Sequence, residues 1–187
     1  MKIKNIVMLV MLVMLVIFTG CSSKYTYHIE PTPLRKGETL YRLGNVNVNL
    51  SLGYGGIEND SRFANAQELT DSFKEDINMY LEKENLLATD DTHADAIVDL
   101  NIFYTRRFNY GGNCLNKPLI SYKASIRNKE GVLASYMIDE FTTKYAYFDD
   151  LAVNLEIATY NWDAEDEPRD IDVVSKIIVQ DIAGLGK

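Results

Sequence analysis

Strict alternation of hydrophobic and polar positions is the first pattern along this chain. Between residues 45 and 52 every second side chain is aliphatic, and the side chains between them are Asn or Ser. A two-residue period of this kind is typical of a strand that is covered on one face. Similar alternation predicts further strands, so the predicted strands are 45–52, 94–107, 120–127 and 132–143. The inward face of the last one stays open, because both of its faces carry hydrophobic side chains.

A helical period lies between and after these strands. Beyond the glycine-rich loop 53–56, Asn59-Asp60-Ser61 offers a helix start, and hydrophobic residues then recur at intervals of three and four through residues 69–81. This spacing predicts an amphipathic helix of about 25 residues. Residues 149–160 are weakly helical, and Pro168 opens a more regular helix near the end of the chain.

The order of these elements, β-α-β-β-β-α(α), predicts an α+β fold in two layers. A helix between the first two strands implies that those strands are parallel and joined by a right-handed crossover. The later strands follow one another through short connections and form an antiparallel meander. We therefore predict a two-layer sandwich in which helices cover one face of a mixed four-stranded sheet. The predicted core consists of Val48, Leu50, Phe73, Ile77, Val98, Leu100 and Ile178.

The N-terminus has the pattern of an export signal. Lys2 and Lys4 precede an unbroken apolar run from Ile6 to Phe18, and small residues follow it. A basic start, a short apolar stretch and a small-residue exit describe a secretory signal peptide. A transmembrane helix is the alternative, but crossing a bilayer core needs about 20 apolar residues and this run is shorter. Residues 1–20 are accordingly predicted to be a signal peptide.

The end of the apolar run resembles the lipobox of bacterial lipoproteins. In Phe18-Thr19-Gly20-Cys21 a hydrophobic residue and two small ones precede a cysteine, although Leu or Val is more common in the lipobox than Phe. The resemblance implies cleavage before Cys21 and a lipid on its sulfur that anchors the chain in a membrane. Ser22 and Ser23 follow without an Asp, which resembles lipoproteins sorted to the outer membrane, facing the periplasm.

The segment that follows the predicted lipidation site lacks a hydrophobic period. It contains two prolines and a glycine among mixed charges, a composition that is typical of a tether. The predicted organisation is therefore a signal peptide (1–20), a lipidated cysteine with a flexible tether (21–40), and one α/β domain (41–187).

Acidic residues dominate the charge of the predicted mature chain. Removing residues 1–20 takes away two of the 19 basic residues and leaves all 27 acidic ones, a formal net charge of −10. Such a chain repels phosphate backbones and anionic headgroups, so nucleic acid is not expected as a partner. With Cys21 lipidated, Cys114 has no partner for an intramolecular disulfide. It is either an inert thiol or a candidate for pairing between chains.

Two short stretches of the domain resemble small envelope lipoproteins of bacteria. Ala94-Asp95-Ala96-Ile97-Val98 follows a long predicted helix, and Asn128-Lys129-Glu130-Gly131 ends a predicted strand. Both features are similar to those of the peptidoglycan-synthase activator lipoproteins and of the amino-terminal domain of the Tol-system translocation protein. The resemblance spans residues 41–183 and implies a binding module without catalytic apparatus. It transfers no site residues to this chain.

The sequence offers no complete motif for catalysis, nucleotides or metals. The glycines of 53–56 do not form a phosphate-binding loop, and no Lys-Ser/Thr pair follows them. His93 lies near Asp90 and Asp95, where a metal could bind, but a solvated turn explains the same residues. No G-x-S-x-G elbow accompanies the serines. We therefore expect no catalytic residue, no cofactor, no metal and no nucleotide.

Two clusters are candidates for binding a protein. Residues 163–172 hold six acidic side chains beside the single tryptophan. They could be a helix start that favours acids, a Ca²⁺ site without the usual loop, or a patch for a basic partner. An aromatic and basic stretch at a strand end could protect a sheet edge or form a binding rim. The predicted partner-binding residues are Trp162, Glu165, Asp166, Glu167, Arg106, Arg107 and Tyr110.

Two functions follow from these predictions. The first is a membrane-anchored, non-enzymatic lipoprotein that acts as a protein-binding accessory module of a cell-envelope complex. The second is a periplasmic immunity-type inhibitor, whose acidic surface would steer it onto a basic toxic enzyme. A hydrolase with a dispersed active site is a third function, which no motif supports.

Overall fold

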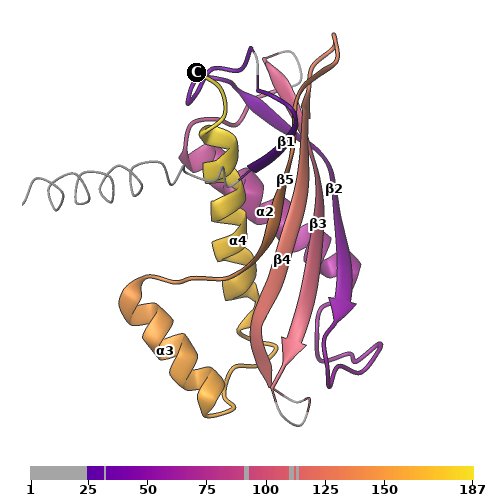
Figure 1. The fold of residues 1–187 in the computed structure, drawn as a ribbon, viewed down its shortest axis with the longest axis vertical. Coiled ribbons are helices and arrows are strands. Elements are labelled where there is room, and N and C mark those ends of the chain that lie inside the picture. Colours follow the sequence, from indigo (N-terminus) through magenta and orange to yellow (C-terminus); the bar gives the residue numbers. More distant parts are fainter. Residues whose placement is uncertain (1–24, 32, 91–92, 110–111, 113) are drawn as a thin grey trace, which may run out of the picture.

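The fold is a mixed five-stranded sheet with helices packed on one of its faces (Figure 1). The computed structural model describes residues 25–31, 33–90, 93–109, 112 and 114–187. Its strands are β1 (Tyr25–Ile29), β2 (Tyr41–Leu52), β3 (Ala96–Phe108), β4 (Leu115–Arg127) and β5 (Val132–Thr142), and its helices are α2 (Ala66–Lys83), α3 (Tyr147–Ala158) and α4 (Glu167–Ala183). The strands lie in the order β1-β5-β4-β3-β2. This architecture confirms the predicted α+β class, with one strand more than predicted.

The crossover unit β2-α2-β3 forms as predicted, with β2 and β3 parallel and β3, β4 and β5 in an antiparallel meander. α2 begins directly after Asn65, whose side chain accepts hydrogen bonds from two backbone N–H groups of the first turn. Glu68 completes this capping box by accepting from the backbone of Asn65. The helix start expected at Asn59-Asp60-Ser61 is wrong, because the Asp60 carboxylate accepts from the backbone N–H of Arg62 and holds a turn there.

β1 lies within the segment predicted to be a flexible tether, so that prediction is wrong for this part of the chain. β1 is antiparallel to β5, with Tyr25 opposite Ile138. The Tyr25 ring packs edge-on against Tyr136, with 5.5 Å between the ring centroids, and its hydroxyl donates to Asp181 of α4 at 3.0 Å. Aromatic packing and hydrogen bonding thus fasten a strand whose neighbouring prolines suggest a loose chain.

Residues 33–40, which lead into β2, are also fixed by contacts with the other end of the chain. Leu34 and Thr39 are buried. The backbone N–H of Lys36 donates to the carbonyl of Lys187, and the N–H of Lys187 donates to the carbonyl of Leu34, each at 3.4 Å. The described residues from Tyr25 onward therefore pack as part of the domain, which was predicted to start at residue 41.

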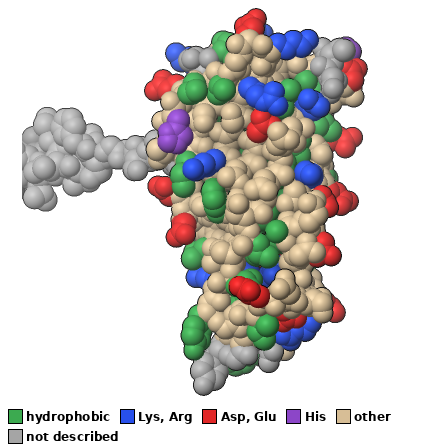
Figure 2. All heavy atoms as spheres, turned by 90° about the vertical axis from the view of Figure 1, so that its right-hand side faces the viewer, with side chains coloured by type: hydrophobic (Ala, Val, Ile, Leu, Met, Phe, Trp, Pro, Cys, Tyr) green, Lys and Arg blue, Asp and Glu red, His purple; other side chains and the backbone are tan. Residues whose placement is uncertain are grey.

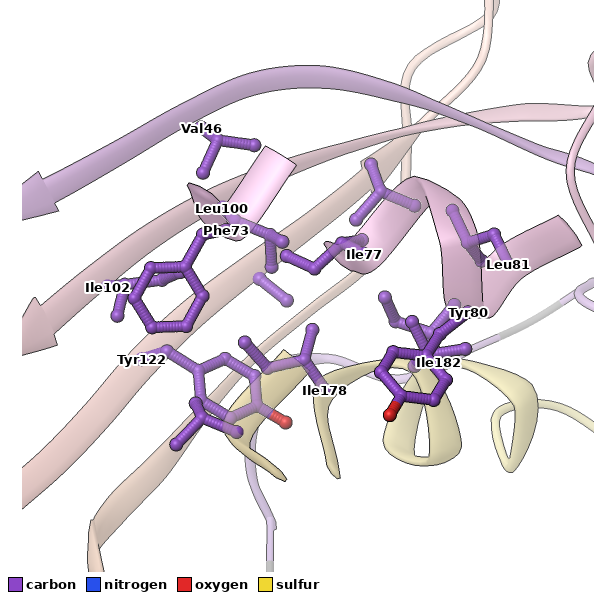
Figure 3. Packing of buried hydrophobic residues seen from close by; sticks show 14 of the residues in the cluster. Val46, Phe73, Ile77, Tyr80, Leu81, Leu100, Ile102, Tyr122, Ile178 and Ile182 are labelled. Atoms are coloured by element: carbon purple, nitrogen blue, oxygen red, sulfur yellow. The ribbon is translucent and has the colours of Figure 1, made fainter. Parts of the chain in front are cut away.

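The core lies between the sheet and the helices α2 and α4. Figure 3 shows Phe73 and Ile77 of α2 facing Ile178 of α4 and Tyr122 of β4. Of the predicted core residues, all are buried except Leu50, which is half-buried and packs against the core. The structure also decides the inward face of β5, which is formed by Ala134, Tyr136 and Ile138.

Because Leu100 is buried and Leu50 is half-buried, truncating these two side chains should lower the free energy of unfolding by different amounts. Leu100→Ala should lower the free energy of unfolding by about 2–5 kcal/mol, because Leu100 is 3% exposed and its loss leaves a cavity. Leu50→Ala should cost less, since part of that side chain already contacts water. Urea titration of both variants measures the difference, and equal losses would contradict this assignment of the strand faces.

Candidate docking surface on helix α3

Helix α3 stands at one end of the sheet, apart from the main body (Figure 1). β2, β3 and β5 run in the same direction, because β2 is parallel to β3 and β4 is antiparallel to both of its neighbours. Their C-terminal ends therefore meet at one end of the molecule. Residues 143–146 lead from β5 to α3, which places the helix at the same end as the loops that follow β2 and β3.

The outward face of α3 is an apolar stripe. Tyr147 and Phe148 are 82% and 81% exposed, and Leu151 and Leu155 are each 64% exposed. Positions i, i+1, i+4 and i+8 lie on one side of a helix, so these four side chains form a single surface, the α3 stripe. The rings of Tyr147 and Phe148 meet edge to face, with 5.5 Å between their centroids. Contiguous exposed apolar side chains mark interaction surfaces.

The opposite face of α3 fastens the helix to the domain. Val153 is its buried residue and belongs to a small second core. The buried members of this second core are Phe63, Leu115, Val153 and Trp162. Lys117 donates to Asp150 at 2.7 Å, and the side-chain amide of Asn109 donates to the carbonyl of Ile157 at 2.8 Å. The attachment therefore uses one side of the helix and leaves the stripe uncovered.

The α3 stripe is absent from the residues predicted to bind a partner. The expected weak helix at 149–160 is present as α3, and its apolar spacing is visible in the sequence. An apolar face usually turns toward a core, however. A sequence pattern does not distinguish a face that the fold covers from one that it leaves open, so the structure was needed to find this surface.

Trp162 is an internal residue and not the surface anchor that was predicted. Its ring is fully buried in the second core. Its Nε1 donates to Asp170 at 3.4 Å, and the Arg169 guanidinium carbon lies 4.6 Å from the ring centroid. The ring thereby fixes the connection between α3 and α4. An internal aromatic side chain with a hydrogen-bond partner cannot also be presented to another protein.

Arg106 and Glu167 likewise contact each other instead of forming a binding rim. Their side chains are 5% and 3% exposed. Nε and Nη2 of Arg106 donate to the two carboxylate oxygens of Glu167 at 2.6 and 2.8 Å. Nη2 also donates to the Ala64 carbonyl, and the Tyr104 hydroxyl donates to Glu167 at 3.2 Å. This bidentate, buried ion pair overturns the predicted partner contacts, because neither charge is accessible.

The other predicted acids and the second arginine differ in their surroundings. Glu165 is exposed, and its role as a contact residue stays a prediction. Asp166 is half-buried at the start of α4 and accepts from Arg169 at 3.1 Å. Arg107 donates from Nε to the carbonyl of Lys117 at 2.7 Å, which holds its side chain against β4.

The two cysteines and Tyr110 complete the set of predicted residues. Cys114 is half-buried, and its thiol donates to the carbonyl of Tyr160, just beyond α3, at 2.8 Å. Cys21 and Tyr110 lie outside the described residues, so their predicted roles stay predictions.

Two carboxyl groups close to α3, those of Asp150 and Asp170, accept hydrogen bonds from other side chains of the domain. Burial raises the pKa of Asp170, although hydrogen bonds from Thr143, Tyr145 and Trp162 act in the opposite direction. The hydrogen bond from Lys117 lowers the pKa of Asp150. Asp149 on α3 and Asp163 and Glu165 just beyond it remain exposed.

The other surface features give weaker indications of a binding site. An open groove of about 780 Å³ runs between α4 and residues 144–146, and its walls mix Lys and Arg with Asp. His93 contacts Asp90 at 2.8 Å in an exposed turn. Within the described residues, no group of His, Cys, Asp and Glu has the arrangement of a metal site. None of the described helices has the length and apolarity needed to cross a bilayer.

Among known proteins, this chain has distant similarity to solved structures. No protein-family model and no curated protein matches the chain. The chain is similar to a minor lipoprotein from Acinetobacter baumannii, with 14% identity, a TM-score of 0.37, and coverage of 75% of this chain and 95% of that one. It is also similar to an uncharacterized protein, with 13% identity, a TM-score of 0.37, and coverage of 77% and 92%. Likeness at this level assigns neither a family nor a function.

The buried ion pair predicts which acid of residues 163–172 matters for stability. Glu167→Ala should lower the free energy of unfolding by about 3–5 kcal/mol, because it leaves the Arg106 charge buried without its partner. Glu165→Ala is the matched control and should change it by less than about 0.5 kcal/mol, since Glu165 is exposed. Chemical unfolding followed by tryptophan fluorescence measures both losses. A Glu167→Ala loss as small as that of the control would refute the ion pair.

The raised pKa of Asp170 predicts a pH-dependent contribution to stability. A carboxyl group whose pKa is higher in the folded than in the unfolded chain stabilises the fold at low pH. That contribution disappears as the pH rises from about 4 through the folded pKa. The wild type should therefore lose stability relative to Asp170→Asn across this window. Urea unfolding of both proteins at a series of pH values tests this, and a difference that is independent of pH would contradict it.

Proposed function

We propose that the protein is a lipid-anchored, non-enzymatic accessory lipoprotein that binds a protein partner of the bacterial cell envelope through the α3 stripe. The observation that carries this proposal is the outward exposure of four large apolar side chains on a helix whose other face is already packed. Burying one such side chain in a partner contributes about 1.5–3 kcal/mol. Aromatic and aliphatic side chains grouped in this way are the kind that dominates the energetics of protein interfaces.

The anchor in this proposal is a lipid on Cys21. Its support is the resemblance of Phe18-Thr19-Gly20-Cys21 to a lipobox, after a basic start and a short apolar run. Ser22 and Ser23 at the following positions favour the outer membrane, with the domain in the periplasm.

The charges around the stripe favour a protein partner over a lipid surface. Asp149 on α3 and Asp163 and Glu165 beyond its C-terminus are exposed, and Lys144 is the exposed base before it. Anionic lipid headgroups would repel this acidic surplus. A protein groove with an apolar floor and a basic rim would accept the stripe and attract the acids. We therefore propose that the α3 stripe docks as a helix into such a groove.

The alternative function, an immunity-type inhibitor of a basic enzyme, has less support. It depends on the acidic run 163–172, in which Glu167 and Asp170 are buried and Asp166 contacts Arg169. Figure 2 shows the side of the molecule that carries β2, where the described Lys and Arg side chains are interspersed with Asp and Glu. On this face, mixed charges of this kind do not produce the single-sign field that steers a basic partner.

Replacing two leucines of the stripe tests the proposed function. Leu151→Ser with Leu155→Ser should reduce capture of the partner by the full-length lipidated protein more than tenfold, which corresponds to about 1.4 kcal/mol or more. The free energy of unfolding should stay within about 0.5 kcal/mol of wild type, because both side chains are exposed. Met79→Ser on α2, a position that is 45% exposed, is the matched control and should retain capture.

Capture is measured by quantitative cross-linking in cells followed by purification of the lipidated protein. A folded double variant that captures the same protein at the wild-type yield would overturn the proposal. If the double substitution instead converts a dimer to a monomer in sedimentation, the stripe belongs to a contact between two copies. If it abolishes binding to phospholipid vesicles and changes no protein contact, the stripe belongs to a membrane surface.

A further inference from the structure

The first strand of the domain directs its N-terminal end toward the α3 side of the molecule. β1 is antiparallel to β5 and begins with Tyr25 opposite Ile138. From Ile138, β5 continues to Thr142 and then through residues 143–146 into α3. Figure 1 shows β5 running down the sheet beyond β1 and the chain then turning outward into α3. The chain therefore enters β1 alongside the part of β5 that leads to α3.

Little chain separates β1 from the lipidation site of the proposed function. Cys21 precedes Tyr25 by four positions, and four extended residues span at most about 14 Å. Tyr25 is fixed by its hydroxyl on Asp181 and its ring on Tyr136. A lipid on Cys21 would hold the β1–β5 edge close to the membrane. The predicted tether would instead have allowed a separation of about 60 Å.

We propose that the α3 stripe is presented at the membrane surface and that its partner is a protein embedded in the same membrane. This inference rests on the proposed function, both for the lipid anchor and for a protein as the occupant of the stripe. A partner free in solution would have to enter the narrow space between this side of the domain and the bilayer. A membrane-embedded partner already lies in that layer, and the short link raises the effective concentration of the stripe there.

The chemistry of the α3 surface describes the contact region of that partner. Its membrane-proximal surface needs an apolar groove for the stripe, with Lys or Arg placed to face Asp149, Asp163 and Glu165. Basic side chains near a bilayer are also attracted by anionic headgroups. When the α3 stripe docks, the acids beside it would take the place of the lipid headgroups around the partner's basic side chains.

A spacer between the anchor and the domain tests the inference. Twenty Gly and Ser residues inserted between Lys24 and Tyr25 keep the lipobox and β1 but add a root-mean-square reach of about 25 Å. A photo-crosslinking amino acid at Ala152, an exposed position beside the stripe, reports contact in cells. We expect the spacer to lower the yield of the protein adduct at least threefold, because the effective concentration falls with linker length. We also expect the partner, in cells without this protein, to resist extraction from membranes by alkaline carbonate.

The same spacer placed after Lys187 is the matched control and should leave the adduct yield unchanged. Equal yields with and without the N-terminal spacer, or a partner that carbonate extracts, would overturn the membrane assignment and leave the docking function standing. An adduct with phospholipid and no protein, or no adduct at all, would overturn the docking function as well. Unchanged thermal unfolding of the spacer variant excludes a folding defect as the cause of a lower yield.

Discussion

The buried ion pair between Arg106 and Glu167 joins β3 to the start of α4, at the end of the molecule that also carries the α3 stripe. Arg106 lies near the end of β3 and Glu167 is the first residue of α4. Two hydrogen bonds join their side chains away from water. Separating them would leave charges without partners in a buried site, which costs several kcal/mol. The start of α4 is therefore tied to the sheet, and the Ala64 carbonyl on the same guanidinium ties the chain that enters α2 to the same point.

The second core lies beside this ion pair, and it is the surface against which α3 packs. The Phe63 ring lies 5.2 Å from the Arg106 guanidinium carbon and packs in the same cluster as Trp162 and Val153. This small cluster accepts one face of α3. No internal surface within the described part of the chain covers the opposite face, which carries two aromatic and two leucine side chains. The stripe is thus exposed beside a small core in which Phe63 also contacts the Arg106 guanidinium.

Regular elements could be predicted from the sequence because their signals are local. The alternation in β2 and the apolar spacing in α2 identify a strand and a helix without any tertiary information, and their order gives the parallel crossover. Side-chain partners are not local. Glu165 and Glu167 are two positions apart in one acidic run, yet one is exposed and the other is buried against Arg106. Which of them faces inward depends on where α4 meets β3. For the same reason the sequence shows the apolar spacing of α3 but not that this face turns outward.

The pairing of β1 with β5 joins the start of the domain to a strand that follows much later in the chain. Tyr25 and Ile138 are separated by more than a hundred positions, and contacts over such separations form late because a long loop must first close. α2, by contrast, can form within its own residues. A chain that emerges N-terminus first exposes β1 well before β5 exists to receive it. The strand that is synthesised first therefore cannot complete its pairing until β5 has been made.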